Sequence, residues 1–371
     1  MVAFCLRIVI AGVGPLLGMI QSDYNLTAGR AGIITTLPLL AFAAFSAIVG
    51  KLGQKLGEGK ILSLSLLVIA AGTVLRSVGG LWGLYLGTAV LGAGVAVGNV
   101  LLPAVVKSEF PEHVGIMTGI TTVAMSLAAA LSLGVSVPMA QTFSFGWRGT
   151  LGIWALVVVI TWVFWHRMRP LRLEQQDDRG KKSLLRSPIT WYVTLYFAAN
   201  SMLFYVMIGW LPTILQSGGI GGTEAGYITS LFQLVGIPTS LLAPIWAGRC
   251  RDQRLVIAIS STISIFGVLM LMFSGSKAMM IAAALLLGLS NGANFSIGLA
   301  LFGFRCANAS DAARLSGIAQ AIGYVIAATG PSVIGALYDL VPRWSICLIY
   351  LLVFMLLSLI VGVKAGEDRT I

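Results

Sequence analysis

Long apolar runs and short polar breaks alternate along the whole chain. Each run is close to the roughly 20 residues that a helix needs to cross the hydrocarbon of a bilayer. The twelve runs cover 1–20, 31–50, 61–79, 82–105, 114–139, 149–166, 189–214, 225–247, 255–274, 278–304, 315–338 and 344–363. This pattern predicts an all-α membrane protein with twelve transmembrane helices.

The composition agrees with a chain that sits in lipid. Of its 371 residues, 57% are apolar and 10% are charged, and the mean hydropathy is +0.93. Soluble domains are about 45–50% apolar and about 25% charged. The composition therefore excludes a soluble globular protein, and the lipid bilayer is the expected surrounding of the chain.

The longest polar break divides the runs into two groups of six. We predict an N-terminal six-helix half at 1–166, a cytoplasmic linker at 167–188 and a C-terminal six-helix half at 189–371. Short matches between the halves, such as 31–37 with 225–231, recur in order at offsets of 194 to 198 residues. They indicate two pseudo-symmetric halves, and transporters of this kind bind substrate between the halves near the midplane.

The basic residues predict the orientation. Of the 24 Lys and Arg, 18 fall in the linker, after every second run or after the last run, while five, including Arg76, fall in the breaks on the other side. Because Lys and Arg favour cytoplasmic loops, the first side and both termini are expected in the cytoplasm. This bias accounts for the net charge of +11, so no nucleic acid partner is expected.

Several segments carry a family resemblance. They are Leu6-Arg7 with Gly14-Pro15-Leu16-Leu17, Thr35-Thr36-Leu37-Pro38, Gly98-Asn99-Val100-Leu101-Leu102-Pro103, Ile208-Gly209-Trp210-Leu211-Pro212, and Leu315-Ser316-Gly317-Ile318-Ala319-Gln320. With them the chain resembles the cyanate / 2-nitroimidazole transporter family of the major facilitator superfamily. It is nearer to the nitroimidazole-exporting members than to the cyanate-transporting ones.

That resemblance implies a function. It implies a major facilitator fold, alternating access and efflux of 2-nitroimidazole-like compounds across a bacterial-type inner membrane. Import of a small anion such as cyanate is the alternative. We expect a monomer that moves a small-molecule substrate and uses no cofactor.

One loop resembles the signature that the superfamily carries between its second and third spans. It contains Gly50, Lys51, Lys55 and Gly57, but Gln54 replaces the usual acidic residue. The corresponding loop of the second half contains Arg249 and keeps an acid at Asp252.

Arg7 is the only charge that we expect well inside an apolar run. From Arg7 to Gln21 a helix rises about 21 Å, which places Arg7 toward the cytoplasmic half of the hydrocarbon. One interpretation is an arginine whose head reaches back to the membrane surface. The other, which the resemblance favours, is a cavity cation that attracts an anion, a nitro group or a carbonyl dipole.

Amides and aromatic residues inside the runs are the other candidates for substrate binding. They are Asn99, Asn200, Tyr205, Trp210, Asn291, Gln320 and Tyr324. Amides both donate and accept hydrogen bonds, and rings with a polar tip suit a flat nitroaromatic compound. The alternative for the amides is hydrogen bonding between helices, and for the aromatic residues a position in the interfacial belt.

Enzymatic chemistry finds no support in the sequence. Gly288-Leu289-Ser290-Asn291-Gly292 fits the pattern of a hydrolase nucleophile, but it lies inside an apolar run, and both histidines, His113 and His166, lie near polar breaks. The four cysteines have neither disulfide nor metal-ligand spacing. All acids fall in breaks or at the ends of runs, so no carboxylate is expected at mid-membrane.

Overall fold

The computed structural model describes residues 1–26, 28–142, 144–167 and 184–371, and all regular structure in these ranges is helical. The first half contains α1 (Val2–Ala11), α2 (Val13–Tyr24), α3 (Ala28–Leu56), α4 (Glu58–Val78), α5 (Gly80–Glu109), η1 (Pro111–His113), α6 (Val114–Thr142), α7 (Gly146–Gly152) and α8 (Trp154–Arg167). The second half contains η2 (Leu184–Arg186), α9 (Pro188–Ser217), α10 (Gly222–Arg249), α11 (Arg254–Met272), α12 (Lys277–Phe304), α13 (Ala309–Leu340) and α14 (Trp344–Ala365).

These helices match the predicted membrane spans. Within the described part, 10 helical segments are long and apolar enough to cross a bilayer. Two shorter apolar segments, Val2–Leu16 and Thr36–Ser46, lie in the first and second predicted runs. The prediction of a twelve-helix membrane fold is confirmed. Of the predicted linker, residues 168–183 lie outside the described part.

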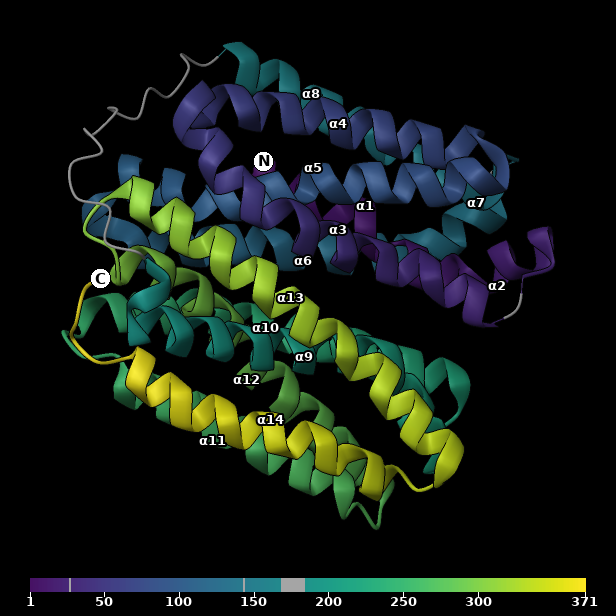
Figure 1. The fold of residues 1–371 in the computed structure, drawn as a ribbon. Coiled ribbons are helices and arrows are strands. Elements are labelled where there is room, and N and C mark those ends of the chain that lie inside the picture. Colours follow the sequence, from purple (N-terminus) through teal and green to yellow (C-terminus); the bar gives the residue numbers. More distant parts are fainter. Residues whose placement is uncertain (27, 143, 168–183) are drawn as a thin grey trace.

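The helices form two bundles that lie against each other (Figure 1). In the first, α4 packs on α5 and α8, and α1 packs on α6. In the second, α9 packs on α13 and α14, while α12 packs on α10 and α11. The bundles meet where α3 and α5 contact α13 and where α6 contacts α10.

The two bundles are in closest contact near the end at which α8 ends and α9 begins, which we call the linker end. A Cβ atom added to Gly115 of α6 would lie 2.3 Å from the Pro244 carbonyl oxygen of α10. One added to Gly317 of α13 would lie 2.7 Å from the Ser46 carbonyl oxygen of α3. Glycine at these two positions lets the backbones of the two halves touch. The described glycines whose Cβ position would meet the other half all lie toward the linker end.

The first predicted run is two helices rather than one. α1 ends at Ala11 and α2 begins at Val13, with Gly12 between them. The hydroxyl oxygens of Ser132 and Ser136 on α6 lie 2.6 and 2.7 Å from the position that a Cβ of Gly12 would take. Glycine therefore permits the close approach of α6 at this break, which the hydropathy pattern does not reveal.

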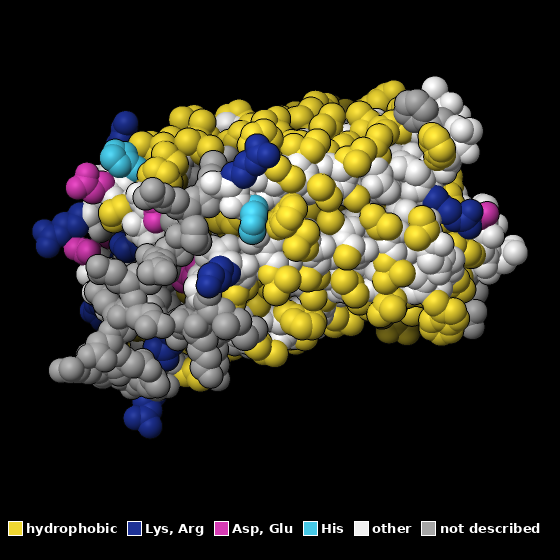
Figure 2. All heavy atoms as spheres, turned by 90° about the horizontal axis from the view of Figure 1, so that it is seen from above, with side chains coloured by type: hydrophobic (Ala, Val, Ile, Leu, Met, Phe, Trp, Pro, Cys, Tyr) yellow, Lys and Arg dark blue, Asp and Glu magenta, His cyan; other side chains and the backbone are white. Residues whose placement is uncertain are grey.

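The surface reflects a membrane environment. Figure 2 shows a broad band of apolar side chains around the middle of the molecule, with Lys and Arg gathered toward one end. Large apolar side chains such as Leu64, Leu156 and Phe266 are 60%, 62% and 60% exposed. A water-soluble surface does not carry so many exposed apolar groups, whereas lipid tails solvate them.

Candidate functional site

A cavity lies between the two halves around the Arg7 side chain. Arg7 is 8% exposed, and its guanidinium carbon lies 5.3 Å from the ring centroids of both Phe204 on α9 and Phe295 on α12. The two rings are stacked, with centroids 6.2 Å apart. A cation over aromatic faces is stabilised by the ring quadrupole, so the charge of Arg7 is held across the boundary between the halves.

Uncharged polar groups complete the lining of the Arg7 cavity. Thr122 and Ser126 come from α6, Gln233 and Ser240 from α10, and Asn291 from α12. The side-chain oxygen of Asn291 is buried without a hydrogen-bond partner in the described part of the chain. Among the described lining residues there is no carboxylate, so the positive charge of Arg7 has no acid to neutralise it there.

Two phenols lie beside this cation. The Tyr205 ring packs edge-on against Phe204, with centroids 5.1 Å apart, and lies 6.4 Å from the Tyr324 ring on α13. The Phe204 ring thus lies against both the Arg7 guanidinium and the Tyr205 ring, which in turn lies near Tyr324. The predicted residues Arg7, Tyr205 and Tyr324 therefore share one neighbourhood.

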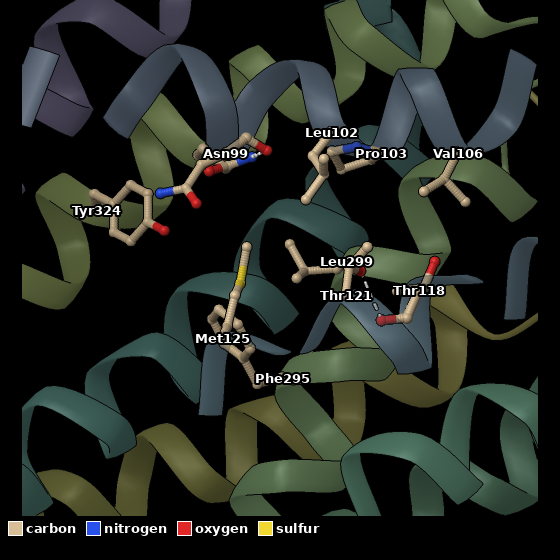
Figure 3. A pocket seen from close by; sticks show the side chains of 11 residues that line it. Asn99, Leu102, Pro103, Val106, Thr118, Thr121, Met125, Phe295, Leu299 and Tyr324 are labelled. Carbon is tan, nitrogen blue, oxygen red and sulfur yellow. Dashed lines mark hydrogen bonds between the residues drawn. The ribbon is translucent and has the colours of Figure 1, made fainter. Parts of the chain in front are cut away.

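A second, smaller cavity lies next to the first, and Met125 and Phe295 line both. Asn99, Leu102 and Pro103 of α5 face Met125 and Leu299 across it (Figure 3). The Gln320 side-chain amide of α13 donates to the Asn99 carbonyl at 2.9 Å, a hydrogen bond between the halves.

The amides of the second cavity keep polar atoms free. The side-chain nitrogen of Asn99 and the side-chain oxygen of Gln320 are buried without a partner in the described part. One can donate and the other can accept a hydrogen bond. The structure therefore places Asn99, Gln320 and Tyr324 around the second cavity and Arg7 and Asn291 around the first.

Asn200 and Trp210 lie away from both cavities. The Asn200 amide donates to the Ser358 hydroxyl at 2.9 Å and to the Tyr196 carbonyl at 2.8 Å. The Trp210 indole donates to the Pro331 carbonyl at 2.9 Å. Each residue is five positions from Tyr205 on α9, which turns it about 140° around the helix axis. Sharing a helix with Tyr205 is thus not enough to reach the site.

Sequence reasoning missed two aromatic residues of this site and one buried charge elsewhere in the first half. Phe204 and Phe295 lie in apolar runs, where nothing distinguishes a site ring from a lipid-facing ring. Arg76 was grouped with the polar breaks, but it lies in α4, is 1% exposed and donates to the Val9 carbonyl at 2.8 Å. Arg76 is therefore a second buried charge of the first half, although it lies in the last turn of α4 and not well inside the span. The sequence does place Arg76 inside the apolar run 61–79, which could have indicated that its side chain is buried.

The predicted loop motif is only partly described. Gly50, Lys51 and Lys55 belong to α3, but their surroundings lie outside what the structure describes. Gly57 has φ of 87°, a left-handed conformation that favours glycine, and it joins α3 to α4. In the second half, Arg249 is exposed in the last turn of α10, and Asp252 forms an ion pair with Arg254 at 3.2 Å.

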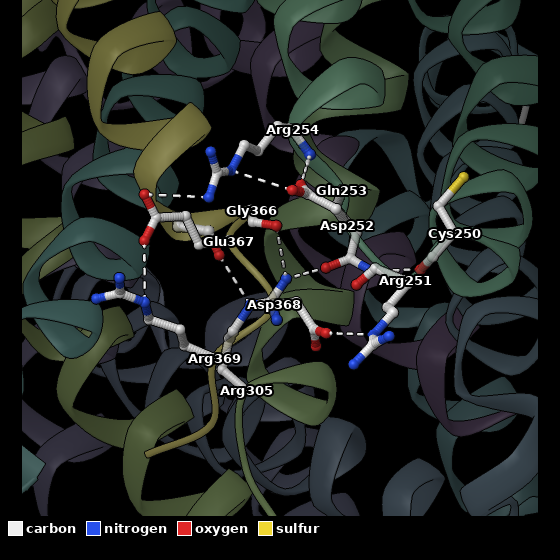
Figure 4. Close-up of polar contacts among 11 residues, drawn as sticks. Cys250, Arg251, Asp252, Gln253, Arg254, Arg305, Gly366, Glu367, Asp368 and Arg369 are labelled. Carbon is white, nitrogen blue, oxygen red and sulfur yellow. Dashed lines mark hydrogen bonds and ion pairs between the residues drawn. The ribbon is translucent and has the colours of Figure 1, made fainter.

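The segment after α14 folds over this second loop (Figure 4). Arg305, which is 2% exposed, donates to the carbonyls of Ala365 and Gly366 at 2.8 and 3.2 Å and also to the Gln253 side chain. Burial lowers the pKa of the Arg305 guanidinium, and the carboxylates of Asp368 and Asp252 oppose that shift. The contacts tie the linker ends of α11, α12 and α14 together.

Metal chemistry has no visible site in the described residues. No group of three or more His, Cys, Asp or Glu is close enough there to hold a metal ion. The four cysteines are free, and burial raises the pKa of the Cys306 thiol to about 12. A thiol with such a pKa stays protonated at neutral pH and is a poor nucleophile.

Comparison with known proteins identifies the family. A model of the Major Facilitator Superfamily matches residues 1–222 and 214–369. The chain is 38% identical over 375 residues to a 2-nitroimidazole transporter of Escherichia coli (strain K12), which covers 100% of this chain and 95% of that protein. It is 37% identical over 373 residues to the uncharacterized transporter YycB of Bacillus subtilis (strain 168), covering 100% and 92%.

More distant relatives agree with this assignment. The cyanate transport protein CynX of Escherichia coli (strain K12) is 24% identical over 335 residues, covering 90% of this chain and 86% of that protein. The crystal structure of FucP in the outward conformation superposes with a TM-score of 0.76 at 14% identity and covers 98% of both chains. The expected fold and the exclusion of an enzyme are confirmed. The chain is a multi-pass membrane transporter and belongs to the Major Facilitator Superfamily.

Proposed function

We propose that the protein exports small planar organic solutes that carry nitro or carboxylate oxygens, with 2-nitroimidazole-like compounds as its substrate class. The observation that carries this proposal is the Arg7 guanidinium, held between two Phe rings in a cavity between the halves with no carboxylate in the described lining. A relative that covers the whole chain is named a 2-nitroimidazole transporter, and this supports the same class.

The chemistry of the cavity suits such a compound. A guanidinium offers several N–H donors in one plane, which match the two oxygens of a nitro or carboxylate group. The rings of Phe204 and Phe295 offer apolar faces on which a flat ring can stack. The amides of Gln233 and Asn291 can bind ring nitrogens without adding charge.

The position of the cavity supports transport by alternating access. The halves touch through Gly115 and Gly317 at the linker end, so the cavity is closed from that end in this structure. Rocking the halves apart there would open the cavity to the other face of the membrane. The excess of Lys and Arg supports a linker end in the cytoplasm of a bacterial-type inner membrane, with both termini on that side.

We further propose how the chain is divided and in which direction it moves its substrate. The functional units are the halves 1–166 and 189–371, joined by the linker 167–188, and one chain with one interhalf site is complete as a monomer. Export is the direction that the family resemblance implies.

Import of a small anion such as cyanate is the second candidate. The charge of Arg7 without an acid beside it favours any anion, and a relative at 24% identity is named a cyanate transport protein. A linear anion would use the guanidinium but would have no flat ring to stack on Phe204 and Phe295. The aromatic lining therefore favours the planar compound.

Transport in proteoliposomes tests both candidates. Vesicles loaded with 2-nitroimidazole, imidazole or cyanate are diluted into buffer, and the same compounds are offered from outside in parallel. We expect 2-nitroimidazole to move faster than in protein-free vesicles and imidazole, which lacks the nitro oxygens, to move much more slowly. Transport of cyanate alone would replace the first candidate with the second, and transport of imidazole at an equal rate would remove the nitro group from recognition.

A further inference from the structure

A second buried arginine, Arg76, lies in the first half, away from the residues that contact Arg7. Arg76 is on α4, is 1% exposed, and its Nη1 donates to the Val9 carbonyl oxygen of α1 at 2.8 Å. Its Nε and Nη2 are buried without a hydrogen-bond partner in the described part. Burying an arginine costs free energy. The hydrogen bond that Arg76 makes to α1 is therefore a candidate reason for its presence.

The contact falls on the break in span 1. In an unbroken helix the carbonyls of Ile8 and Val9 would bind the amides of Gly12 and Val13, where the break occurs. Here the Ser132 hydroxyl of α6 donates to the Ile8 carbonyl at 2.8 Å, next to the bond from Arg76 to Val9. Two side chains from two helices thus hold the carbonyl end of α1.

The charge of Arg76 explains why an arginine stands there. The carbonyl end of a helix carries the negative pole of its dipole, which attracts a cation. Ser132 donates to the Ile8 carbonyl without carrying a charge, so a neutral donor would be sufficient to satisfy the Val9 carbonyl as well. The guanidinium adds an electrostatic attraction to the whole end of α1, and Arg7 lies one turn away from that end on the same short helix.

We infer that Arg76 is a positioning residue, which holds the carbonyl end of α1 at the break in span 1 and so keeps Arg7 at the cavity. This inference rests on the proposed function only where transport is measured. The position of α1 can be followed independently, because α1 carries Cys5. Its thiol is fully buried and lies 3.2 Å from the Thr161 hydroxyl of α8.

The test measures the release of α1 by the labelling of Cys5. A protein with Cys250→Ser and Cys306→Ser keeps two buried thiols, Cys5 in α1 and Cys347 in α14. Maleimide labelling of each is followed by peptide mass spectrometry in Arg76→Met, Arg76→Lys and Arg76→Gln. The control is Ser77→Ala, the adjacent residue, whose hydroxyl bonds to the Thr73 carbonyl within α4.

We expect Cys5 in Arg76→Met to label at least fivefold faster than in the parent protein, with Cys347 unchanged. Arg76→Lys keeps the charge and should stay near the parent rate. Arg76→Gln keeps a donor but loses the charge, so it should label faster. Labelling of Cys5 at the parent rate in both Arg76→Met and Arg76→Gln would overturn the inference. Faster labelling of Cys347 as well would overturn it, because the effect would then be general unfolding.

Transport of 2-nitroimidazole separates this inference from the proposed function. We expect Arg76→Met to raise KM at least fivefold and Arg76→Lys to keep it near the parent value. If Arg7→Ala abolishes transport while Arg76→Met behaves like Ser77→Ala, the positioning inference fails and the proposed site stands. If Arg7→Ala transports normally while Cys5 is released in Arg76→Met, the proposed site fails and Arg76 still holds α1.

Discussion

Arg7 is the residue on which the proposed site depends most. Its guanidinium lies against Phe204 and Phe295, with no carboxylate in the described lining of the cavity. A hydrogen bond to a charged group contributes about 1.5–3 kcal/mol, which corresponds to roughly 10- to 100-fold in binding. A substrate with paired oxygens would therefore lose much of its affinity without this side chain.

Replacement of Arg7 tests that dependence. We expect Arg7→Ala to abolish transport at near-normal membrane abundance, and Arg7→Lys to be poorly active because it keeps the charge but loses the planar donors. Transport of 2-nitroimidazole in proteoliposomes measures the effect. The exposed Arg343→Ala, at the end of the molecule away from the linker, is the matched control. Normal transport by Arg7→Ala would show that Arg7 only anchors the helix at the membrane surface.

The Phe295 ring distinguishes between the two candidate substrates. Leucine at this position keeps an apolar side chain but removes the aromatic face, on which a stacked substrate ring gains about 1 kcal/mol or roughly fivefold in binding. We expect Phe295→Leu to raise the KM for 2-nitroimidazole by about that factor and to leave the transport of a small inorganic anion nearly unchanged. Phe266→Leu, at a 60% exposed ring of α11, is the control. An equal loss for both substrates would argue against stacking.

At the residue scale, sequence reasoning identified polar atoms better than it identified surfaces. Arg7, Asn99, Asn291 and Gln320 could be selected because a polar group inside an apolar run is costly and must face something polar. The same rule selects Asn200, although its amide has a protein partner: it donates to the Ser358 hydroxyl, which meets its need for a hydrogen bond as well as a substrate would. The two Phe rings carry no such cost and therefore gave no signal.

Among the helices, α6 shows most directly how the halves close. Gly115 and Gly134 are both glycines of this helix, but only Gly115 is against the other half. A methyl group at Gly115 would lie 2.3 Å from the Pro244 carbonyl, and a backbone atom cannot move aside as a flexible side chain can. At Gly134 no atom lies within 4 Å of the same position.

Gly115→Ala should therefore hold the linker end apart. We expect it to slow transport at least tenfold and to raise the labelling of a cysteine placed at Thr118 from the linker side, because the closed state becomes too costly. Gly134→Ala should transport at the rate of the parent. Equal rates for the two variants would show that α6 and α10 need not touch during the cycle.

The prediction of helices succeeded for lengths and failed for breaks. Hydropathy averages over about 20 residues, so it found the spans but could not find the interruption at Gly12. That interruption depends on Ser132 and Ser136 of α6, which lie over a hundred residues away and fill the space beside the glycine. A tertiary contact of this kind leaves no periodic signal in the sequence.

For the whole molecule, orientation in the membrane is the main prediction to test. Reporters fused after Lys60, Gly180 and Arg254 should read cytoplasmic, and those after Asp23 and Gly221 periplasmic, because Lys and Arg are concentrated on the first side. At each position one fusion carries a phosphatase and a second carries a fluorescent protein. The two reporters are active on opposite sides of the membrane, so together they give the side of each loop. A periplasmic result at Gly180 would contradict the division into two six-helix halves.

The contacts of Arg7 have a consequence for the thermodynamics of transport. The guanidinium belongs to the first half, and both rings that hold it belong to the second. Any motion that separates the halves at this level moves the Arg7 guanidinium, which would bind the charge of the ligand, away from the Phe204 and Phe295 rings, on which the ligand would stack. Affinity is then a property of the conformation, so the same compound will have different dissociation constants at the two faces of the membrane. That inequality sets the concentration at which the compound leaves the site on each side, while the gradients across the membrane set the net direction of transport.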